Sequence, residues 1–146
     1  MKQFLSSVLV ALASVVMSFS YAQQKLDAKA LPAEWHLYSS QNGVNIFVKS
    51  FDYTYNPALK PANFALVKVE NTTRKPLTLS YSTVLSDDQG CINCESGENT
   101  KSVQIAAGQT LEGTPEISGL SFLVANPNFS APREAKFIQL SNIKLK

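Results

Sequence analysis

The feature that most constrains this chain is a series of short segments in which apolar and polar residues alternate. In the segment Leu77–Leu85 large, mostly apolar residues occupy every second position. The positions between them include Thr78, Ser80 and Ser82. A period of two is that of an extended strand with one buried face. No stretch has apolar residues at helical spacing over three turns, and no period of 20–50 residues repeats. The sequence therefore predicts an all-β chain.

Several other segments are rich in β-branched and aromatic residues and are bounded by Gly, Pro, Asn or Asp, as strands are. The expected strands are Trp35–Ser39, Val44–Tyr55, Phe64–Glu70, Leu77–Leu85, Val103–Ala107 with a continuation at Leu111, Leu120–Ala125 and Lys136–Lys146. The residues Gln41-Asn42-Gly43 supply a turn between the first two. We expect an immunoglobulin-like two-sheet antiparallel sandwich of 7–8 strands over residues 35–146. A small barrel is the alternative.

The alternation changes phase at two places. Beyond Lys49 the large residues move to Phe51, Tyr53 and Tyr55, and in the last segment the phase changes near Ser141-Asn142. An extra residue in a strand shifts the side chains that follow to the other face. We therefore expect a β-bulge at each place, or a crossing between sheets at the first.

The N-terminus has the layout of a secretory signal. Lys2 precedes an uncharged apolar run from Leu5 to Tyr21, which closes on Ser20-Tyr21-Ala22. We predict a cleavable signal peptide over 1–22 and a flexible leader over 23–34. Removing Lys2 lowers the net charge from +2 to about +1, so neither nucleic acid nor an anionic membrane is indicated as a partner. We expect a soluble periplasmic or extracellular (secreted) protein, without membrane insertion after cleavage.

Cys91-Ile92-Asn93-Cys94 is the motif with intrinsic reactivity. In an oxidising compartment we expect Cys91 and Cys94 to form a small-loop disulfide that pins a hairpin loop. A redox role would need a stabilised thiolate, whereas the surrounding acidic residues raise a thiol pKa. A zinc site would need more ligands than two cysteines and the distant His36, and haem attachment would need histidine where Glu95 stands. Thiol redox chemistry or metal handling remains the alternative function.

Two further patterns contain residues capable of chemistry. Asp87, Asp88, Glu95 and Glu98, with nearby asparagines, could supply the oxygen ligands of a hard cation such as calcium, although their spacing is not that of an EF-hand. We expect a solvated turn there instead. His36, the sole histidine, is expected at the surface, and no Gly-x-Ser-x-Gly elbow accompanies it. No catalytic residue, no metal and no cofactor is predicted.

Phe51, Tyr53 and Tyr55 alternate with polar residues along one expected strand. On an exposed face, rings at this spacing would suit stacking on a sugar or anchoring a protein partner. In the core they would be packing residues, which is the commoner outcome. They are the candidate ligand-binding residues of the chain.

The stretch "VKVENTTRKPLTLSYSTVL" over Val67–Leu85, followed by the cysteine loop and "VQIAAGQTLEG", resembles small exported bacterial proteins of immunoglobulin-like type. The resemblance implies a sandwich in the periplasm or outside the cell and implies no activity. We therefore expect a non-catalytic binding or interaction module whose partner is a protein or glycan of the bacterial cell envelope.

Overall fold

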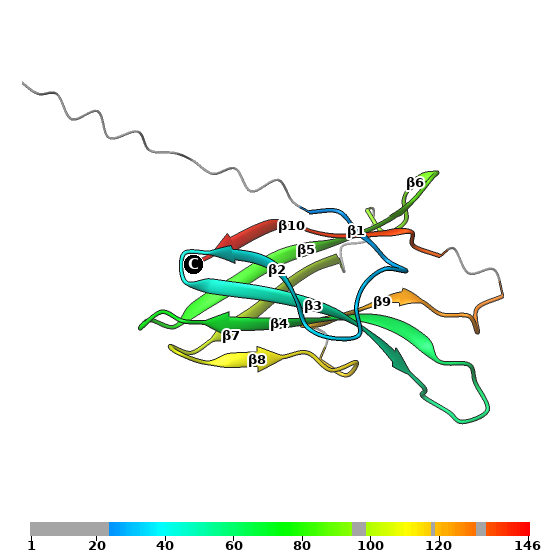
Figure 1. Cartoon of the computed structure of the whole chain (residues 1–146), viewed down its shortest axis with the longest axis horizontal. Coiled ribbons are helices and arrows are strands. Elements are labelled where there is room, and N and C mark those ends of the chain that lie inside the picture. Colours follow the sequence, from blue (N-terminus) through cyan, green and yellow to red (C-terminus); the bar gives the residue numbers. More distant parts are fainter. Residues whose placement is uncertain (1–23, 95–98, 118, 131–133) are drawn as a thin grey trace, which may run out of the picture.

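The computed structural model describes residues 24–94, 99–117, 119–130 and 134–146. These residues form ten strands, β1 to β10, and no α-helix, and the strands make two antiparallel sheets that pack face to face (Figure 1). The prediction of an all-β, two-sheet antiparallel sandwich is confirmed. The predicted signal peptide over 1–22 lies outside the described residues. Within the described part, no helix is long and apolar enough to span a membrane.

One sheet, called here the β4 sheet, is built around its central strand β4. A meander of hairpins joins β2 to β3 and β3 to β4, and two short strands pair with the other side of β4, one after the other. Its strands are β2 (His36–Gln41), β3 (Val44–Tyr53), β4 (Ala62–Asn71), β8 (Thr110–Glu112) and β9 (Ser121–Ala125).

The other sheet, called the β5 sheet, has β5 at its centre. β10 pairs with one side of β5 and carries β1 at its far edge, while β7 and β6 pair with the other side of β5. Its strands are β1 (Leu26–Asp27), β5 (Leu77–Asp87), β6 (Gly90–Cys91), β7 (Thr100–Ile105) and β10 (Phe137–Leu145).

The main core lies between the two sheets and is made of alternate residues, as the period of two requires. Its members are almost all aliphatic, and burying each such side chain contributes about 1.5–3 kcal/mol. Those with at most 1% of their surface exposed are Val44, Ile46, Val48, Ala65, Val67, Val69, Leu79, Tyr81, Ile105, Ile138 and Leu140.

The two expected phase changes have different outcomes. β10 has a register irregularity between Ser141 and Lys144, with Asn142 at φ 51°, which confirms the predicted bulge. β3 has none, because its ladder with β4 runs without interruption from Val44↔Asn71 to Tyr53↔Ala62. Phe51 and Tyr53 therefore lie on the outer face of the β4 sheet, opposite Val44, Ile46 and Val48. The apolar residues shift phase because a second cluster covers that outer face.

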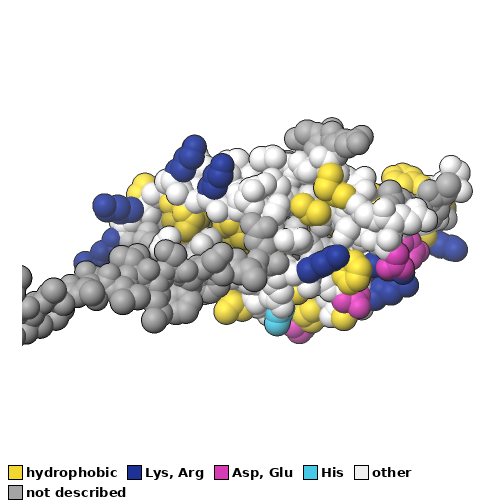
Figure 2. Space-filling model, turned by 90° about the horizontal axis from the view of Figure 1, so that it is seen from above, with side chains coloured by type: hydrophobic (Ala, Val, Ile, Leu, Met, Phe, Trp, Pro, Cys, Tyr) yellow, Lys and Arg dark blue, Asp and Glu magenta, His cyan; other side chains and the backbone are white. Residues whose placement is uncertain are grey.

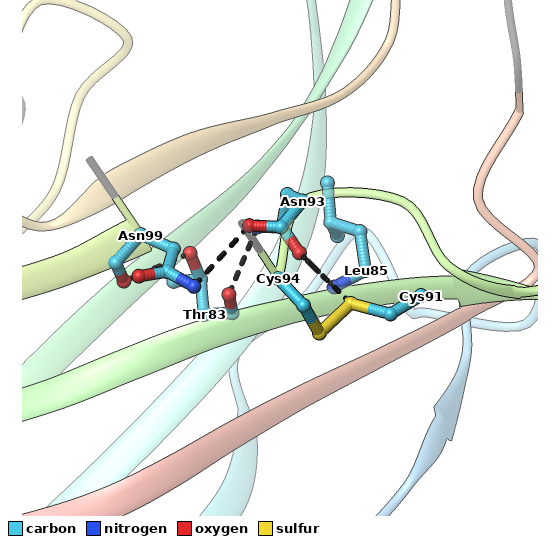
Figure 3. Close-up of a disulfide and its surroundings, with 6 residues drawn as sticks. All are labelled: Thr83, Leu85, Cys91, Asn93, Cys94 and Asn99. Atoms are coloured by element: carbon cyan, nitrogen blue, oxygen red, sulfur yellow. Dashed lines mark hydrogen bonds between the residues drawn. A yellow bond between two sulfur atoms is a disulfide. The ribbon is translucent and has the colours of Figure 1, made fainter. Parts of the chain in front are cut away.

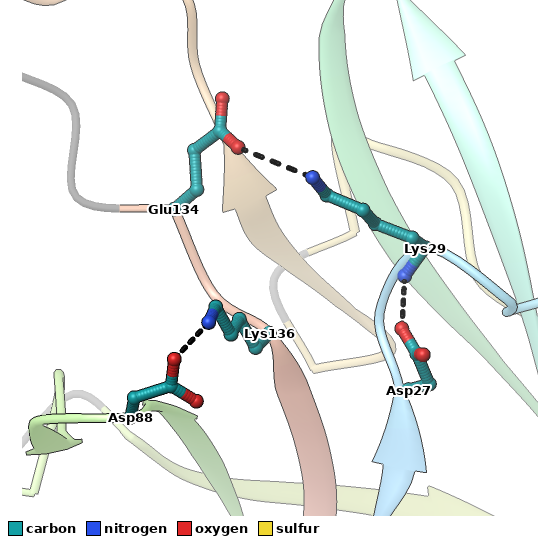
Figure 4. Close-up of polar contacts among 5 residues, drawn as sticks. All are labelled: Asp27, Lys29, Asp88, Glu134 and Lys136. Atoms are coloured by element: carbon teal, nitrogen blue, oxygen red, sulfur yellow. Dashed lines mark hydrogen bonds and ion pairs between the residues drawn. The ribbon is translucent and has the colours of Figure 1, made fainter.

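The segment before β2 differs from the flexible leader predicted over 23–34. From Gln24 onward it packs on the domain: β1 pairs with β10, and Ala28 and Leu31 are each 8% exposed. The backbone N–H of Ala28 donates to the carbonyl of Lys136 at 2.8 Å. Lys29 lies 4.0 Å from Glu134, and its backbone N–H donates to Asp27 (Figure 4). Backbone pairing and two buried apolar side chains order this segment, and neither produces a visible period in the sequence.

Tyr38 ties the two sheets together. It sits at a register irregularity of β2, between Leu37 and Ser39, and its ring is 8% exposed in the main core. Its hydroxyl accepts a hydrogen bond from the backbone N–H of Leu140 at 2.9 Å and lies 2.9 Å from the Leu140 carbonyl and 2.8 Å from that of Gln24. Burial raises the pKa of Tyr38, and the hydrogen bond to the Leu140 backbone offsets part of this. One side chain thus joins β2, the N-terminal segment and β10.

Replacing Tyr38 with phenylalanine tests this tie. Tyr38→Phe leaves the buried N–H and carbonyl of Leu140 without their partner, so we expect the free energy of unfolding to fall by about 1–3 kcal/mol. Urea unfolding followed by circular dichroism measures it. The matched control is Tyr55→Phe, which removes a hydroxyl from a ring that is 62% exposed and should change little. Equal stability of the two variants would contradict the tie.

Candidate functional site

A second apolar cluster lies on the outer face of the β4 sheet, away from the main core. Ala62, Phe64 and Leu66 of β4 are its buried members, and Trp35, Tyr53 and Leu123 pack against them. β4 alternates between the two faces, so its residues 65, 67 and 69 fill the main core while these fill the outer cluster. A sheet whose outer face is apolar can present that face to a partner.

The three predicted ligand-binding residues extend this cluster. The ring centroids of Phe51 and Tyr53 are 6.4 Å apart, and those of Tyr53 and Tyr55 are 4.8 Å apart and nearly perpendicular. Phe64 lies beneath, 6.4 Å from Tyr53 and 6.1 Å from Tyr55. Phe51 is 38% and Tyr55 62% exposed. The structure thus brings the three rings together at the surface and not in the core.

Two lysines cover the other half of the outer face. The Lys49 ammonium lies 4.5 Å from the centre of the Trp35 ring, and the Lys68 ammonium lies 4.2 Å from that of Phe47 and 3.3 Å from Glu70. Cations over aromatic faces are attracted by the ring quadrupole, and lysine stems cover apolar surface. Figure 2 shows how hydrophobic, basic and acidic side chains intersperse on one side of the molecule. The Lys49 ammonium also lies 5.9 Å from the centre of the Phe51 ring, so of the three predicted rings Tyr53 and Tyr55 are those without a lysine over them in the described part of the chain.

A carboxylate borders these open rings. Interaction of the Tyr53 hydroxyl with the Glu116 side chain and with its negative charge raises the pKa of Tyr53. Hydrogen bonds from Thr114, from its own backbone and from Tyr53 lower the pKa of Glu116. Sequence reasoning missed Glu116, because it belongs to the β8–β9 connection and no local pattern relates it to Tyr53.

Two loops at the same end of the molecule share one turn motif. Asn56-Pro57-Ala58-Leu59 and Asn126-Pro127-Asn128-Phe129 each begin with an asparagine whose side chain accepts from the backbone N–H two residues on, at 2.9 and 3.0 Å. The Asn128 side chain and the Lys60 backbone exchange two hydrogen bonds, of 3.1 and 2.9 Å. The two loops are therefore fixed to each other.

Exposed large hydrophobic residues concentrate at this end. Four of the six in the described part of the chain belong to it, namely Phe51 at 38%, Tyr55 at 62%, Leu59 at 46% and Phe129 at 60% exposed. We call these four residues with Tyr53 the apolar end. Rigid apolar groups gathered in one region are typical of a binding surface.

The cysteine motif forms the predicted disulfide. Cys91 and Cys94 are bonded through their sulfurs, with their Cα atoms 5.8 Å apart, and both residues are exposed (Figure 3). The bond closes a short loop between β6 and β7. This loop is far in sequence from the residues of the apolar end. Its effect on the fold is local.

Asn93, inside that loop, takes the place of a strand beside β5. Its side chain accepts from the Leu85 N–H at 2.8 Å and donates to the Thr83 carbonyl at 2.9 Å. The β7 pairing ends at Ser82↔Thr100 and the β6 pairing begins at Ser86↔Cys91, so Asn93 bridges the gap between them. An open strand edge invites pairing with other chains. The loop therefore protects this part of β5.

The remaining predicted alternatives have these positions. Of the acidic residues considered for a cation, Glu95 and Glu98 lie outside the described residues, Asp88 pairs with Lys136 (Figure 4), and Asp87 accepts from the Gln89 N–H at 2.8 Å. The described residues contain no group of three His, Cys, Asp or Glu side chains placed to hold a metal. His36 is exposed on β2.

Comparisons with known proteins give one structural likeness. No family model matches the chain, and no curated protein matches it. A solved structure of a DUF1425 family member from Shewanella sp. pv-4 aligns with 77% of this chain and 94% of that chain, at 16% identity and a TM-score of 0.39. Nothing about function is carried over from it.

The role of Asn93 can be separated from that of the disulfide. Asn93→Ala leaves the Leu85 N–H and the Thr83 carbonyl without partners, so we expect a loss of about 1–2 kcal/mol in the free energy of unfolding and faster hydrogen exchange at Leu85. The double variant Cys91→Ser/Cys94→Ser removes the loop closure, whose chain-entropy contribution is on the order of 2 kcal/mol. Asn99→Ala, a peripheral neighbour, is the control. Unchanged exchange at Leu85 in Asn93→Ala would disprove the strand-like role.

Proposed function

We propose that this chain is an exported, non-catalytic binding module of the bacterial cell envelope, and that its apolar end holds a protein or glycan ligand. The observation that carries the proposal is the concentration of exposed large hydrophobic residues on two loops and one strand end that are fixed to each other. A preorganised surface loses little conformational entropy on binding. Lys49 and Lys68 lie over Trp35 and Phe47 on the same sheet, and Lys49 approaches Phe51 only at 5.9 Å, so Tyr53 and Tyr55 are the rings open to a ligand.

The protonation chemistry of the apolar end favours binding over catalysis. A general acid or base works best with a pKa near the operating pH. Here the pKa of Glu116 is lowered and that of Tyr53 is raised, so both pKa values move farther from neutral pH. The pair is suited to fixed hydrogen bonding, with Glu116 charged and Tyr53 neutral.

The secretory layout of residues 1–22 and the disulfide support a location in the periplasm or outside the cell. An oxidising compartment is where a disulfide such as Cys91–Cys94 persists. The small net charge gives no basis for a nucleic acid partner, and we propose no membrane insertion after cleavage.

We also infer that the sandwich is of the immunoglobulin-like type. β4, β5, β7, β9 and β10 follow one another as strands B, C, C′, E and F do in that fold. The pairs β4·β9, β5·β10 and β5·β7 correspond to B·E, C·F and C·C′. β1 beside β10 stands where strand G would be, and β2 and β3 extend the sheet of strand B.

Nuclear magnetic resonance tests the proposed function. The secreted, ¹⁵N-labelled protein is titrated with a bacterial envelope fraction, and we expect selective broadening of amide signals from residues 51–55, 59 and 129. The double variant Tyr55→Ser/Phe129→Ser removes two of the most exposed apolar groups and should weaken the response about tenfold or more.

The matched control for this titration is Leu37→Ser. Leu37 is also exposed, at 48%, but pairs with Phe47, in the half of β3 that is farther from the β3–β4 loop. The Leu37→Ser variant should respond to the envelope fraction as the unmodified protein does. Broadening spread over the whole chain, or equal loss in the control and the double variant, would contradict the proposal.

A further inference from the structure

The ring of Tyr55 is an open and fixed platform. It stands nearly perpendicular to Tyr53 at 4.8 Å and tilted on Phe64 at 6.1 Å, and yet it is 62% exposed. The rings of Tyr53 and Phe64 thus pack against one side of the Tyr55 ring, and solvent contacts its other side. A tyrosine offers a large rigid contact area at low entropic cost.

Hydrogen-bonding groups lie beside that platform. The Glu116 carboxylate and the Tyr53 hydroxyl interact closely enough to shift each other's pKa, and Thr114 lowers the pKa of the same carboxylate. A carboxylate accepts up to about four hydrogen bonds, and a phenol oxygen can accept as well as donate. In the described part of the chain, no Lys or Arg forms an ion pair with Glu116. The carboxylate therefore keeps acceptor capacity toward solvent.

This combination suits a sugar better than a protein surface. A pyranose ring has apolar C–H faces that stack on an aromatic ring and hydroxyls at its edge that donate to a carboxylate. A protein that covered Glu116 would have to desolvate the charge without a cation to compensate it. The Lys49 ammonium is nearer to Trp35, at 4.5 Å, than to Phe51, at 5.9 Å, and Lys68 lies over Phe47. The charge that acts on Tyr53 is the negative charge of Glu116, which disfavours an anionic sugar on the adjacent Tyr55 ring.

We propose that the apolar end binds a neutral glycan, with a pyranose ring stacked on Tyr55 and ring hydroxyls bonded to the Tyr53–Glu116 pair. Phe51, next along the strand at 6.4 Å from Tyr53, offers a second contact for an adjoining sugar. The inference rests on the proposed function and names the ligand class of that site.

The probes are three soluble neutral oligosaccharides, namely chitotetraose, cellotetraose and maltotetraose, each titrated into the secreted, ¹⁵N-labelled protein. We expect saturable shifts with at least one of them, confined to residues 51–55 and 114–116. Tyr55→Ala should weaken that binding about tenfold, whereas Tyr55→Phe keeps the ring and should bind as the unmodified protein does. Glu116→Gln should weaken it severalfold.

The control is Leu37→Ala, an exposed apolar change outside the apolar end, and it should bind unchanged. Absence of saturable shifts with all three sugars, or undiminished binding in Tyr55→Ala, overturns the glycan inference. If the envelope fraction still perturbs residues 51–55 and 129 after such a result, the proposed function stands with a protein as ligand. If neither the sugars nor the envelope fraction perturbs them, both proposals fall.

Discussion

The uninterrupted ladder between β3 and β4 is the constraint on which the rest of the structure depends. Each residue of β3 from Val44 to Tyr53 has a partner on β4 in continuous register. Successive side chains of a strand must point to opposite faces, so placing Val44, Ile46 and Val48 in the core places Phe51 and Tyr53 outside it. The outward rings are thus a direct consequence of how the core is filled.

β4 makes this arrangement stable because it is apolar on both faces. Its odd-numbered residues from 65 to 69 belong to the main core, and Ala62, Phe64 and Leu66 support the outer rings. Lysine stems cover Trp35 and Phe47, and the two Asn-Pro turns brace the far end against each other. Lysine side chains therefore cover one half of the outer face, and aromatic rings remain exposed on the other half. That division is why binding is proposed at one end only.

Alternation in the sequence was enough to predict the longer strands and the bulge at Ser141-Asn142, but not the two-residue strands β1 and β6. The residue types predicted the Asn42-Gly43 turn, in which both residues have positive φ. It misassigned the phase change beyond Lys49, because one strand's pattern is the same for a bulge and for a second apolar face. The distinguishing signal was in the partner strand, where "ANFAL" over 62–66 is apolar at both parities. Glu116 and Asn93 were beyond prediction, since a hydrogen bond between a side chain and a distant group leaves no periodic trace. The pairing of Cys91 with Cys94 needed only their spacing and compartment.

Photochemically induced nuclear polarisation of tyrosine rings tests most directly whether the aromatic ladder faces outward, since a dye in solution polarises only rings that it can touch. The β3–β4 register places Tyr53 on the outer face, and Tyr55 packs on Tyr53 just beyond the strand. The account therefore predicts a strong signal from Tyr55, assigned by its loss in Tyr55→Phe, and silence from Tyr38 and Tyr81, which are 8% and 1% exposed. A silent Tyr55 would mean that the aromatic rings at the end of β3 are covered or turned inward, and the site built on them would not exist.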